Sequence, residues 1–480
     1  MGYLSPLEGF RMSFVTDTKN NKDPGTGKVW YHCNTSTAAD VPAAVESSHA
    51  AFRQFGKTTP RQRADWLWKW HFAIQEAKED LATILTHESG KPLAESRGEI
   101  DYALGFTRWF AGEAERVFGE LSIPSAPNRR AIALKQPIGV AVALVPWNFP
   151  ISMVLRKAAA ALAAGCTIIV KPSPETPLTA LALGKLALKA GFLAGVLNVL
   201  TPDNANTPDL TKALCEHPLV KKVTFTGSTP VGKLISLWCA PSLKKLTLEL
   251  GGNCPFIVFE DADLDAVADQ LMALKWRNAG QACISANRAI VQDSVYEKFA
   301  EIVLEKTKRL SMGCGSDPKT NFGPLTTPKG PQRASELVEN AKAHGGRIVY
   351  GGQAPTNSEG YFFNPTIILD ATKDMDIGQQ ESFCPVLGLF KFSKEEEALA
   401  FANSTSMGLA SYVFTQDVDR LWRMFENLEA GMIGLNTGHH SAAELQFGGT
   451  KDSGYGKEGG KDVSVAEYLI TKSGTFTLRL

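Results

Sequence analysis

The sequence lacks several patterns that would assign a function at once. Its eight cysteines are scattered, with no CxxC pair, and no histidine stands at metal-ligand spacing, so neither a metal site nor a disulfide framework is expected. Lys plus Arg and Asp plus Glu both total 50, which leaves no net charge to attract nucleic acid or an anionic membrane. We therefore expect free thiols in a reducing compartment, and partners that are small molecules or further copies of this chain.

Targeting and membrane-spanning patterns are also missing. No charged segment followed by an apolar run opens the sequence, so the expected location is the cytoplasm. The most apolar region, 138–171, is interrupted by prolines and by the pair Arg156-Lys157, which argues against a membrane span. The single GxGxxG, at 454–459, follows no predicted strand and is therefore no dinucleotide fingerprint.

What the chain does contain is a regular alternation of strand-like and helix-like segments. A chain of 480 residues is too long for one compact core, so two domains are expected. Apolar spacing predicts helices at 41–55, in 60–89, at 93–115 and at 152–164, and strands within 129–145. Between 167 and 249 strands and helices alternate, which predicts a parallel sheet with right-handed crossovers and an α/β fold.

The same rhythm resumes further along. Strands at 289–292 and 347–350 and helices at 295–309 and 332–344 indicate a second α/β unit, which we expect to be smaller than the first. The tail, 468–480, alternates like a strand but has no obvious partner in either unit. Because an unpaired edge strand is costly, we assign the tail to contacts between subunits.

Candidate chemistry begins at Cys283, in the stretch LKWRNAGQACISANR (274–288). Gly280 and Ala282 leave this thiol without bulky neighbours. A cysteine is a nucleophile only as the thiolate, in a position that lowers its pKa and leaves it reachable. A free cysteine is more often a small buried hydrophobe, so the interpretation as a nucleophile depends on partners elsewhere in the chain.

Three other segments supply such partners. The turn at 225–228 joins a strand to a helix whose first N–H groups suit a pyrophosphate, although it is equally an ordinary βα turn. Asn148, between two prolines, has an amide that suits a developing oxyanion, against the simpler role of a structural turn residue. Glu249, among apolar residues at a strand end, is expected to have a raised pKa, as a general base requires.

Together these groups predict aldehyde oxidation through a covalent thioester. From about Asp23 to its end the chain resembles the aldehyde dehydrogenase family, and within it the succinate-semialdehyde dehydrogenases. Six motifs carry the resemblance in the family's order: PWNFP (146–150), FTGS (225–228), LELGG (248–252), GQAC (280–283), ESFCP (381–385) and FGGTKDSGYGKEG (447–459).

The resemblance implies a fold with three parts. These are a Rossmann-type cofactor domain (1–121 and 138–249), an α/β catalytic domain (250–447) and a small β oligomerisation element (122–137 and 466–480). It also implies that Cys283 attacks the aldehyde, that the Asn148 amide and the Cys283 backbone N–H hold the oxyanion, and that Glu249 activates the hydrolytic water. The residues implied in cofactor binding are Val145, Pro146, Trp147, Lys171, Ser173, Phe225, Thr226, Gly227, Ser228, Leu250, Glu381 and Phe383.

Departures from the family pattern affect the cofactor and redox expectations. NAD-specific relatives place a glutamate three residues after the lysine equivalent to Lys171, whereas this chain has Pro174 there, with Glu175 one position off. Lys171 and Ser173 suit a 2′-phosphate, so NADP or NAD is expected, with NADP favoured. Cys384 replaces the glycine usual after Phe383, and Ser285 replaces the second cysteine of many relatives, so no disulfide switch is expected in the catalytic loop.

Substrate preference is implied by three positions. Arg156, Arg277 and Ser441 match residues with which succinate-semialdehyde dehydrogenases hold the substrate carboxylate, and guanidinium forks suit that group. His439 and His440 replace apolar residues usual in that loop, so another ω-semialdehyde or an aromatic or aliphatic aldehyde stays open. Two further alternatives are a non-catalytic binding protein of the same fold and a CoA-acylating enzyme, although the latter normally lacks the base. The expected assembly is a homodimer or a homotetramer.

Overall fold

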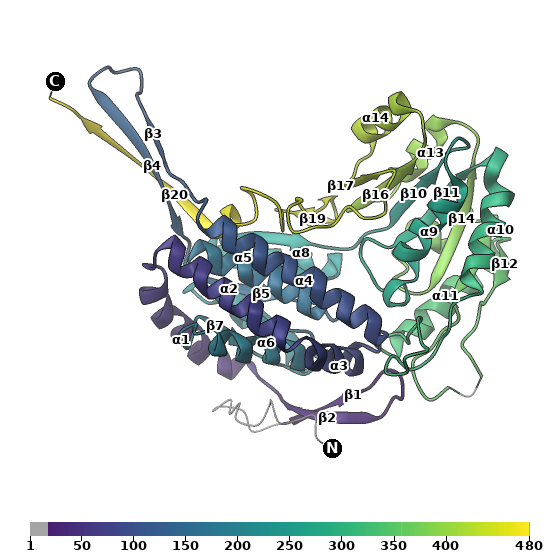
Figure 1. The fold of residues 1–480 in the computed structure, drawn as a ribbon, viewed down its shortest axis with the longest axis horizontal. Helices are drawn as coiled ribbons and strands as arrows, with labels where there is room; N and C mark the ends of the chain where they lie inside the picture. The colour runs from purple at the N-terminus through teal and green to yellow at the C-terminus, as the bar shows by residue number, and fades with distance from the viewer. Residues whose placement is uncertain (1–17, 357, 480) are drawn as a thin grey trace.

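The structure, a computed structural model, describes residues 18–356 and 358–479. It is built on two large, mostly parallel sheets, each with helices on both faces, and a smaller three-stranded sheet that extends from the body as an arm (Figure 1). The C-terminal end of the described chain lies at the tip of this arm. The parallel α/β organisation predicted from the alternation of strands and helices is therefore confirmed.

The first large sheet has the strand order β19-β9-β8-β5-β6-β7. Its strands are β5 (Val140–Leu144), β6 (Thr167–Lys171), β7 (Leu197–Val199), β8 (Val220–Thr226), β9 (Lys245–Glu249) and the short β19 (Gly454–Tyr455). All neighbours run parallel except β19, which is antiparallel to β9. The segment with the discarded GxGxxG thus begins as an edge strand of this sheet.

Helices cover both faces because the strands are apolar on both sides. Every residue of β5 is buried: Ala141 and Ala143 belong to one core cluster, and Val140 and Val142 to the cluster on the opposite face. Burial on both faces is expected for the inner strands of a parallel sheet. The first face is covered by α2 (Pro60–Glu76), α4 (Leu93–Ala114), α5 (Pro150–Ala164) and α6 (Pro177–Lys189), with α3 (Lys78–Ser89) against them, and the other by α1 (Val41–Phe55), α7 (Thr207–Glu216) and α8 (Thr229–Cys239).

The second large sheet has the order β12-β13-β14-β11-β10-β16-β17, antiparallel only at its β12 edge. Its strands are β10 (Cys254–Val258), β11 (Ala286–Gln292), β12 (Arg347–Tyr350), β13 (Thr366–Leu369), β14 (Val386–Phe392), β16 (Ala410–Phe414) and β17 (Met432–Leu435). The helices α9 (Leu264–Lys275), α10 (Tyr296–Thr307) and α11 (Lys329–Ala343) lie on one face, with the short α12 (Asp376–Gln379), and α13 (Glu395–Ala402) and α14 (Val418–Asn427) on the other. Within the described residues its sheet has seven strands, against six in the first.

The tail strand has a partner within its own chain. β20 (Leu469–Thr477) pairs antiparallel with β4 (Arg129–Pro137) along nine residues, and β3 (Glu120–Ser122) flanks β4 on the other side. Two small ladders complete the fold, β1 (Thr18–Lys22) with β2 (Val29–Asn34) and β15 (Met407–Gly408) with β18 (Thr450–Lys451). β20 thus pairs with the 122–137 segment and lies outside both large sheets.

Two further predictions concern the helical pattern at 60–89 and the absence of targeting or membrane-spanning segments. The helical pattern at 60–89 is two helices rather than one, because the chain leaves helical geometry at Ala77 (φ −89°, ψ 13°). The prediction that no targeting segment opens the chain concerns residues outside the described ranges. None of the helices within 18–356 and 358–479 is long and apolar enough to cross a membrane.

Candidate active site

Cys283 follows a tight turn at the end of the short 3-10 helix η4 (Arg277–Gly280). Asn278, Ala279 and Gly280 all have positive φ, of 51°, 51° and 77°, a costly backbone for the two residues with a Cβ. A Cβ on Gly280 would lie 2.5 Å from the Cys384 carbonyl oxygen, so only glycine fits there. The turn is held in place by the Asn278 side chain, which donates to the Asn148 carbonyl at 3.0 Å.

The thiol lies where two cavities meet. A cavity of about 280 Å³ on one side and another of about 260 Å³ on the other both include Cys283 in their lining. The residue is partly exposed, in contrast to the buried Cys254 beneath it, whose thiol donates to the Cys283 carbonyl at 3.3 Å. A ligand in either cavity would therefore lie close to Cys283.

Glu249, at the end of β9, is placed to act on this thiol. The Cys283 Sγ donates to Glu249 Oε1 at 3.2 Å, and Thr226 Oγ1 donates to Glu249 Oε2 at 3.0 Å. Burial and the charge of Glu458 raise the pKa of Glu249. Burial and the Glu249 charge likewise raise the pKa of Cys283 well above its usual value. The Cys283 thiol, which needs a base, is thus hydrogen-bonded to the Glu249 carboxylate, whose basicity is raised.

A buried chain of polar groups continues behind Glu249. Lys157 Nζ donates to Thr226 Oγ1 at 2.7 Å and is ion-paired with Glu458, which also accepts from Thr224 Oγ1 at 2.8 Å. Glu458 comes from the segment after β19, so the docking of that edge strand brings this carboxylate behind the sheet end. The GxGxxG segment therefore contributes a charge to the site rather than a phosphate loop.

The Asn148 loop is held by a buried ion pair that sequence reasoning missed. Lys91 and Glu99, each 1% exposed, are 2.6 Å apart. Lys91 Nζ also donates to the Asn148 carbonyl at 2.7 Å, and Glu99 accepts the N–H groups of Ile151 and Ser152 at the start of α5. The Asn148 amide donates one hydrogen to the Gln281 carbonyl at 3.1 Å. Since an amide NH₂ has two hydrogens, the second stays available for an oxyanion.

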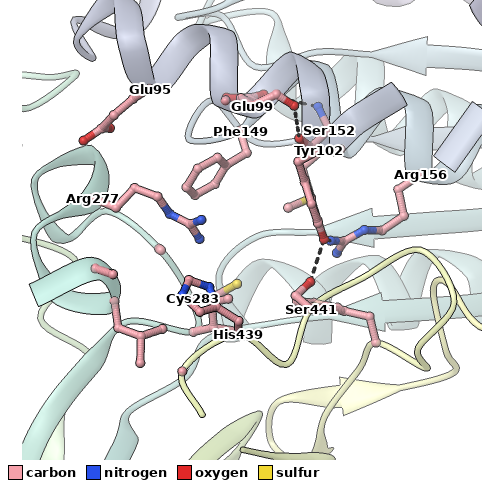
Figure 2. A pocket seen from close by; sticks show the side chains of 18 residues that line it. Glu95, Glu99, Tyr102, Phe149, Ser152, Arg156, Arg277, Cys283, His439 and Ser441 are labelled. Carbon is pink, nitrogen blue, oxygen red and sulfur yellow. Dashed lines mark hydrogen bonds between the residues drawn. The ribbon is translucent and has the colours of Figure 1, made fainter. Parts of the chain in front are cut away.

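The larger cavity brings together the residues predicted to bind the substrate (Figure 2). Arg156, on α5, donates to the Tyr102 hydroxyl at 2.7 Å, and that hydroxyl is 2.6 Å from Ser441 Oγ. The guanidinium of Arg156 also lies 3.9 Å from the centre of the Phe447 ring, a distance at which a cation is attracted to an aromatic face. Tyr102 therefore connects the two positions that the resemblance singled out.

Arg277 enters the cavity from the opposite side (Figure 2). It is exposed, and its guanidinium lies 5.2 Å from the centre of the Phe149 ring. Of the two histidines, His439 lines the cavity. His440 instead packs with Tyr412, ring centres 5.1 Å apart, and burial lowers its pKa to about 4, so His440 is neutral at physiological pH.

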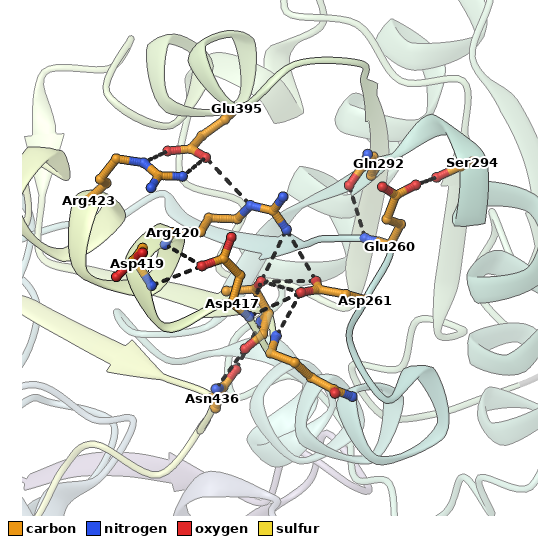
Figure 3. A network of polar contacts seen from close by, with 12 residues as sticks. Glu260, Asp261, Gln292, Ser294, Glu395, Asp417, Asp419, Arg420, Arg423 and Asn436 are labelled. Atoms are coloured by element: carbon orange, nitrogen blue, oxygen red, sulfur yellow. Dashed lines mark hydrogen bonds and ion pairs between the residues drawn. The ribbon is translucent and has the colours of Figure 1, made fainter.

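The loop that carries Ser441 begins at a fixed point. Asn436, with φ 55°, bonds the backbone of Thr415 through both ends of its amide, at 3.0 and 2.9 Å. Thr415 in turn donates to Asp261, which also accepts two backbone N–H groups and faces Arg420 at 3.3 Å (Figure 3). This network fixes where the chain leaves β17, and hence where Ser441 reaches the cavity.

The smaller cavity is lined mainly by the residues predicted to bind the cofactor. Eight of those twelve line it: Pro146, Trp147, Thr226, Gly227, Ser228, Leu250, Glu381 and Phe383. Glu381 Oε1 accepts the Gly252 N–H at 3.0 Å, and burial raises the pKa of Glu381 to about 7. The rings of Trp147 and Phe383 meet edge to face at 5.5 Å.

The other four predicted positions, Val145, Lys171, Ser173 and Phe225, are buried and are not among the residues that line this cavity. Lys171 ends β6, and burial lowers its pKa to about 8. Ser173 donates a hydrogen bond to Glu175, so a carboxylate lies beside the position at which a 2′-phosphate was expected.

The smaller cavity offers groups that suit the phosphate and sugar parts of a dinucleotide. Gly251 leaves the cavity open, because a Cβ there would lie 3.0 Å from Glu381 Oε2. Ser228 caps α8 without a side-chain hydrogen bond in the described chain, so the first N–H groups of this helix remain free for a phosphate. Glu381 supplies a carboxylate for sugar hydroxyls.

Sequence reasoning missed Lys91, Glu99, Tyr102, Lys157 and Glu458. Glu99 and Tyr102 had a weak signal, because they follow Glu95 at helical spacing and so share one face of α4. Lys157 had a clearer one, because a second charge beside Arg156 in the most apolar part of the chain needs a buried partner. That the partner is Glu458, 301 positions away, had no local signal.

Comparisons with known proteins agree with this geometry. The chain is 44% identical over 456 residues to "Succinate-semialdehyde dehydrogenase [NADP(+)] 1" of Schizosaccharomyces pombe, covering 95% of this chain and 91% of that protein. It is 43% identical over 450 residues to a 3-sulfolactaldehyde dehydrogenase of Pseudomonas putida, covering 94% and 92%. A crystal structure of succinate-semialdehyde dehydrogenase from Burkholderia pseudomallei superposes with a TM-score of 0.94 at 41% identity, covering 96% of this chain and 95% of the other.

The family model described as "Aldehyde dehydrogenase family" matches residues 14–473. The chain therefore belongs to the aldehyde dehydrogenase family.

Proposed function

We propose that this enzyme oxidises succinate semialdehyde to succinate with a nicotinamide dinucleotide, NADP in preference to NAD. The observation that carries the substrate is the cavity beside Cys283, in which Arg156 and Arg277 lie on opposite sides and Ser441 bonds to Tyr102. Two guanidinium groups in a largely apolar cavity suit a carboxylate a few carbons from the aldehyde. The names of two of the similar proteins support the same substrate.

Each catalytic group has a role that follows from its contacts. Cys283 passes its proton to Glu249, 3.2 Å away, and its sulfur attacks the aldehyde carbon. The free hydrogen of the Asn148 amide and the Cys283 backbone N–H stabilise the resulting oxyanion. A bound nicotinamide would accept the hydride, which leaves a thioester on Cys283. Glu249 first releases the Cys283 proton to solvent. It then takes a proton from water as that water attacks the thioester, and the thiolate leaves.

The name of one relative and the position of Lys171 support NADP as the cofactor. The carboxylate of Glu175 argues against it. The S. pombe protein carries NADP(+) in its name, and Lys171 would attract a 2′-phosphate. Glu175, hydrogen-bonded to Ser173, would repel it. We expect kcat/KM to be higher with NADP, and Glu175→Gln to increase the ratio of NADP to NAD efficiency. A strong preference of the wild type for NAD would mean that Glu175 binds the ribose hydroxyls instead.

The substrate proposal is tested with matched aldehydes. We expect kcat/KM for succinate semialdehyde to exceed that for butanal by a hundredfold or more, because losing two charge-assisted contacts costs about 3 kcal/mol. The double variant Arg156→Ala/Arg277→Ala should remove most of this preference. Lys233→Ala, an exposed cation on α8 that pairs with Asp452, serves as a control that changes charge outside the cavity.

Other results would select the alternatives. A preference for butanal, or an unchanged ratio in the double variant, would make the arginines structural. A preference for a sulfonate aldehyde would place this enzyme beside the P. putida relative in substrate. Acid formation that depends on CoA would indicate acyl transfer, and no turnover of any aldehyde would leave a binding protein.

Domains and assembly remain part of the proposal. We assign 1–121 and 138–249 to cofactor binding, 250–447 to catalysis, and 122–137 with 466–480 to oligomerisation into a homodimer or homotetramer. The apolar side chains of Leu121, Ile123, Ile132 and Leu134 on the β3–β4 arm are exposed, which supports a subunit contact there. The cytoplasm stays the expected location.

A further inference from the structure

Arg156 has more hydrogen-bond donors than partners. Its side chain is 2% exposed, yet only Nη2 has a partner, the Tyr102 hydroxyl at 2.7 Å. The buried Nε and Nη1 have no hydrogen-bond partner within the described chain. Buried donors without partners are costly, so a ligand oxygen in this cavity would be strongly favoured at Nε and Nη1.

The same guanidinium also faces the general base. Arg156 Nη1 lies 3.7 Å from Glu249 Oε2, too far for a hydrogen bond but close enough for a strong electrostatic effect in a buried site. Glu249 is 1% exposed, so water does not screen this pair. Arg156 thus touches the proposed substrate position on one side and the base on the other.

Arg156 is the cation near Glu249 that has no carboxylate at hydrogen-bond distance within the described chain, although the charges of Glu249 and Glu458 both act on it. The charged or titratable groups that face Glu249 are Arg156 and Lys157 on α5, Glu458 after β19, Cys283, and Glu381 before β14. Lys157 is ion-paired with Glu458, whereas the hydrogen-bond partner of Arg156 is a neutral phenol. The positive charge of Arg156 favours the ionised form of Glu249 and so weakens it as a base.

We propose that Arg156 is shared between Glu249 and the substrate carboxylate, so that binding of an anionic aldehyde strengthens Glu249 as the base. This rests on the function proposed above, and it gives Arg156 a positioning role beyond holding the substrate. A carboxylate bonded to Nε and Nη1 balances the guanidinium charge that otherwise acts on Glu249. A neutral aldehyde leaves that charge in place, so it meets a weaker base both at thiol deprotonation and at hydrolysis.

The test compares pH profiles of the wild type with two aldehydes. Between pH 5.5 and 9 the substrate carboxylate stays ionised, and kcat reports groups in the substrate complex whereas kcat/KM reports the free enzyme. We expect the acid limb of kcat to lie about one pH unit higher for succinate semialdehyde than for butanal, as two charges several ångströms apart imply. The acid limbs of kcat/KM should coincide, because the free enzyme is the same.

Variants separate this role from substrate binding alone. In Arg156→Gln the two kcat limbs should coincide, and in Arg156→Lys, which keeps the charge, part of the difference should return. Arg277→Gln is the matched comparison, because Arg277 lines the same cavity without a contact to Glu249. It should raise KM for succinate semialdehyde and leave the difference between the kcat limbs intact.

The outcomes distinguish the two proposals. Coincident kcat limbs in a wild type that still prefers succinate semialdehyde would overturn the sharing of Arg156 and leave the substrate proposal standing. No preference for the anionic aldehyde would overturn the substrate proposal itself. A limb difference that disappears equally in Arg277→Gln and Arg156→Gln would show that any loss of substrate contact suffices, which also overturns the inference.

Discussion

The two cavities that meet at Cys283 are built from the chain in different ways. The cofactor-side cavity has eleven lining residues, of which ten were named from the sequence. The substrate-side cavity has eighteen, of which only Arg156, Arg277, Cys283 and Ser441 were named as catalytic or binding residues. The first is made of short contiguous motifs at the carboxyl ends of parallel strands, where such folds bind ligands. The second is made of single side chains from α4, α5, η4 and the loop after β17.

This difference predicts what mutations should do. On the cofactor side, backbone groups and glycines shape the cavity, so single side-chain changes there should have small effects. On the substrate side, a few charged and hydroxyl groups act together, so one change should propagate to its neighbours. The base Glu249 belongs to both sides, because Thr226 binds it from one and Arg156 faces it from the other.

The largest effect is expected where the two sides meet. Glu249→Gln should lower steady-state kcat about a thousandfold, because an amide cannot take the proton of the hydrolytic water. Rapid-quench measurements should still show a burst of reduced cofactor, since hydride transfer precedes hydrolysis. The burst should be slower than in the wild type, because Glu249 also accepts the Cys283 proton, but this slowing should be smaller than that of hydrolysis. Cys283→Ala should abolish both phases, and Cys254→Ser, which keeps the donor to the Cys283 carbonyl, should retain them. If Glu249→Gln showed no burst although Cys283 stayed reactive, the base of hydrolysis would have been assigned to the wrong step or the wrong residue.

A smaller effect should be confined to the substrate side. Tyr102→Phe removes the hydroxyl between Arg156 and Ser441, at the cost of about one or two hydrogen bonds, so KM for succinate semialdehyde should rise about tenfold. The KM for NADP should not change, because Tyr102 does not line the cofactor-side cavity. Equal changes in both constants would mean that the two cavities are coupled more closely than their construction indicates.

The smallest effect concerns the cofactor side and depends on pH. The pKa of Glu381 is raised to about 7 by burial, so the carboxyl is largely protonated at pH 6 and ionised at pH 8. Because only the ionised form accepts two sugar hydroxyls without offering a proton, the Kd for NADP should fall several-fold over that range. Glu381→Gln should flatten the dependence in a fluorescence titration. A wild-type Kd that rises with pH would contradict the assignment.

The features that could be predicted from the sequence are those with a local pattern. The apolar spacing at 41–55 identified α1 (Val41–Phe55) with its observed bounds, because amphipathic helices carry strong local periodicity. The helical pattern at 60–89 joined α2 and α3 because nothing in the apolar spacing marks the break at Ala77.

The missed residues share one cause. Lys91, Glu99, Lys157 and Glu458 are charged residues that typical patterns place on the surface, and each is buried here beside its partner. A charged side chain can be buried only beside a suitable partner, and the partner of Lys157 is distant in sequence. The sequence alone does not identify this partner, because the fold brings the two residues together. The family resemblance named the groups proposed to react, but not the groups that hold them in place.

The 301 residues between Lys157 and Glu458 have a consequence for biosynthesis. At about ten residues per second, roughly half a minute separates the synthesis of these two partners. The set of charges around Glu249 is therefore complete only when β19 pairs with β9 and Glu458 reaches Lys157.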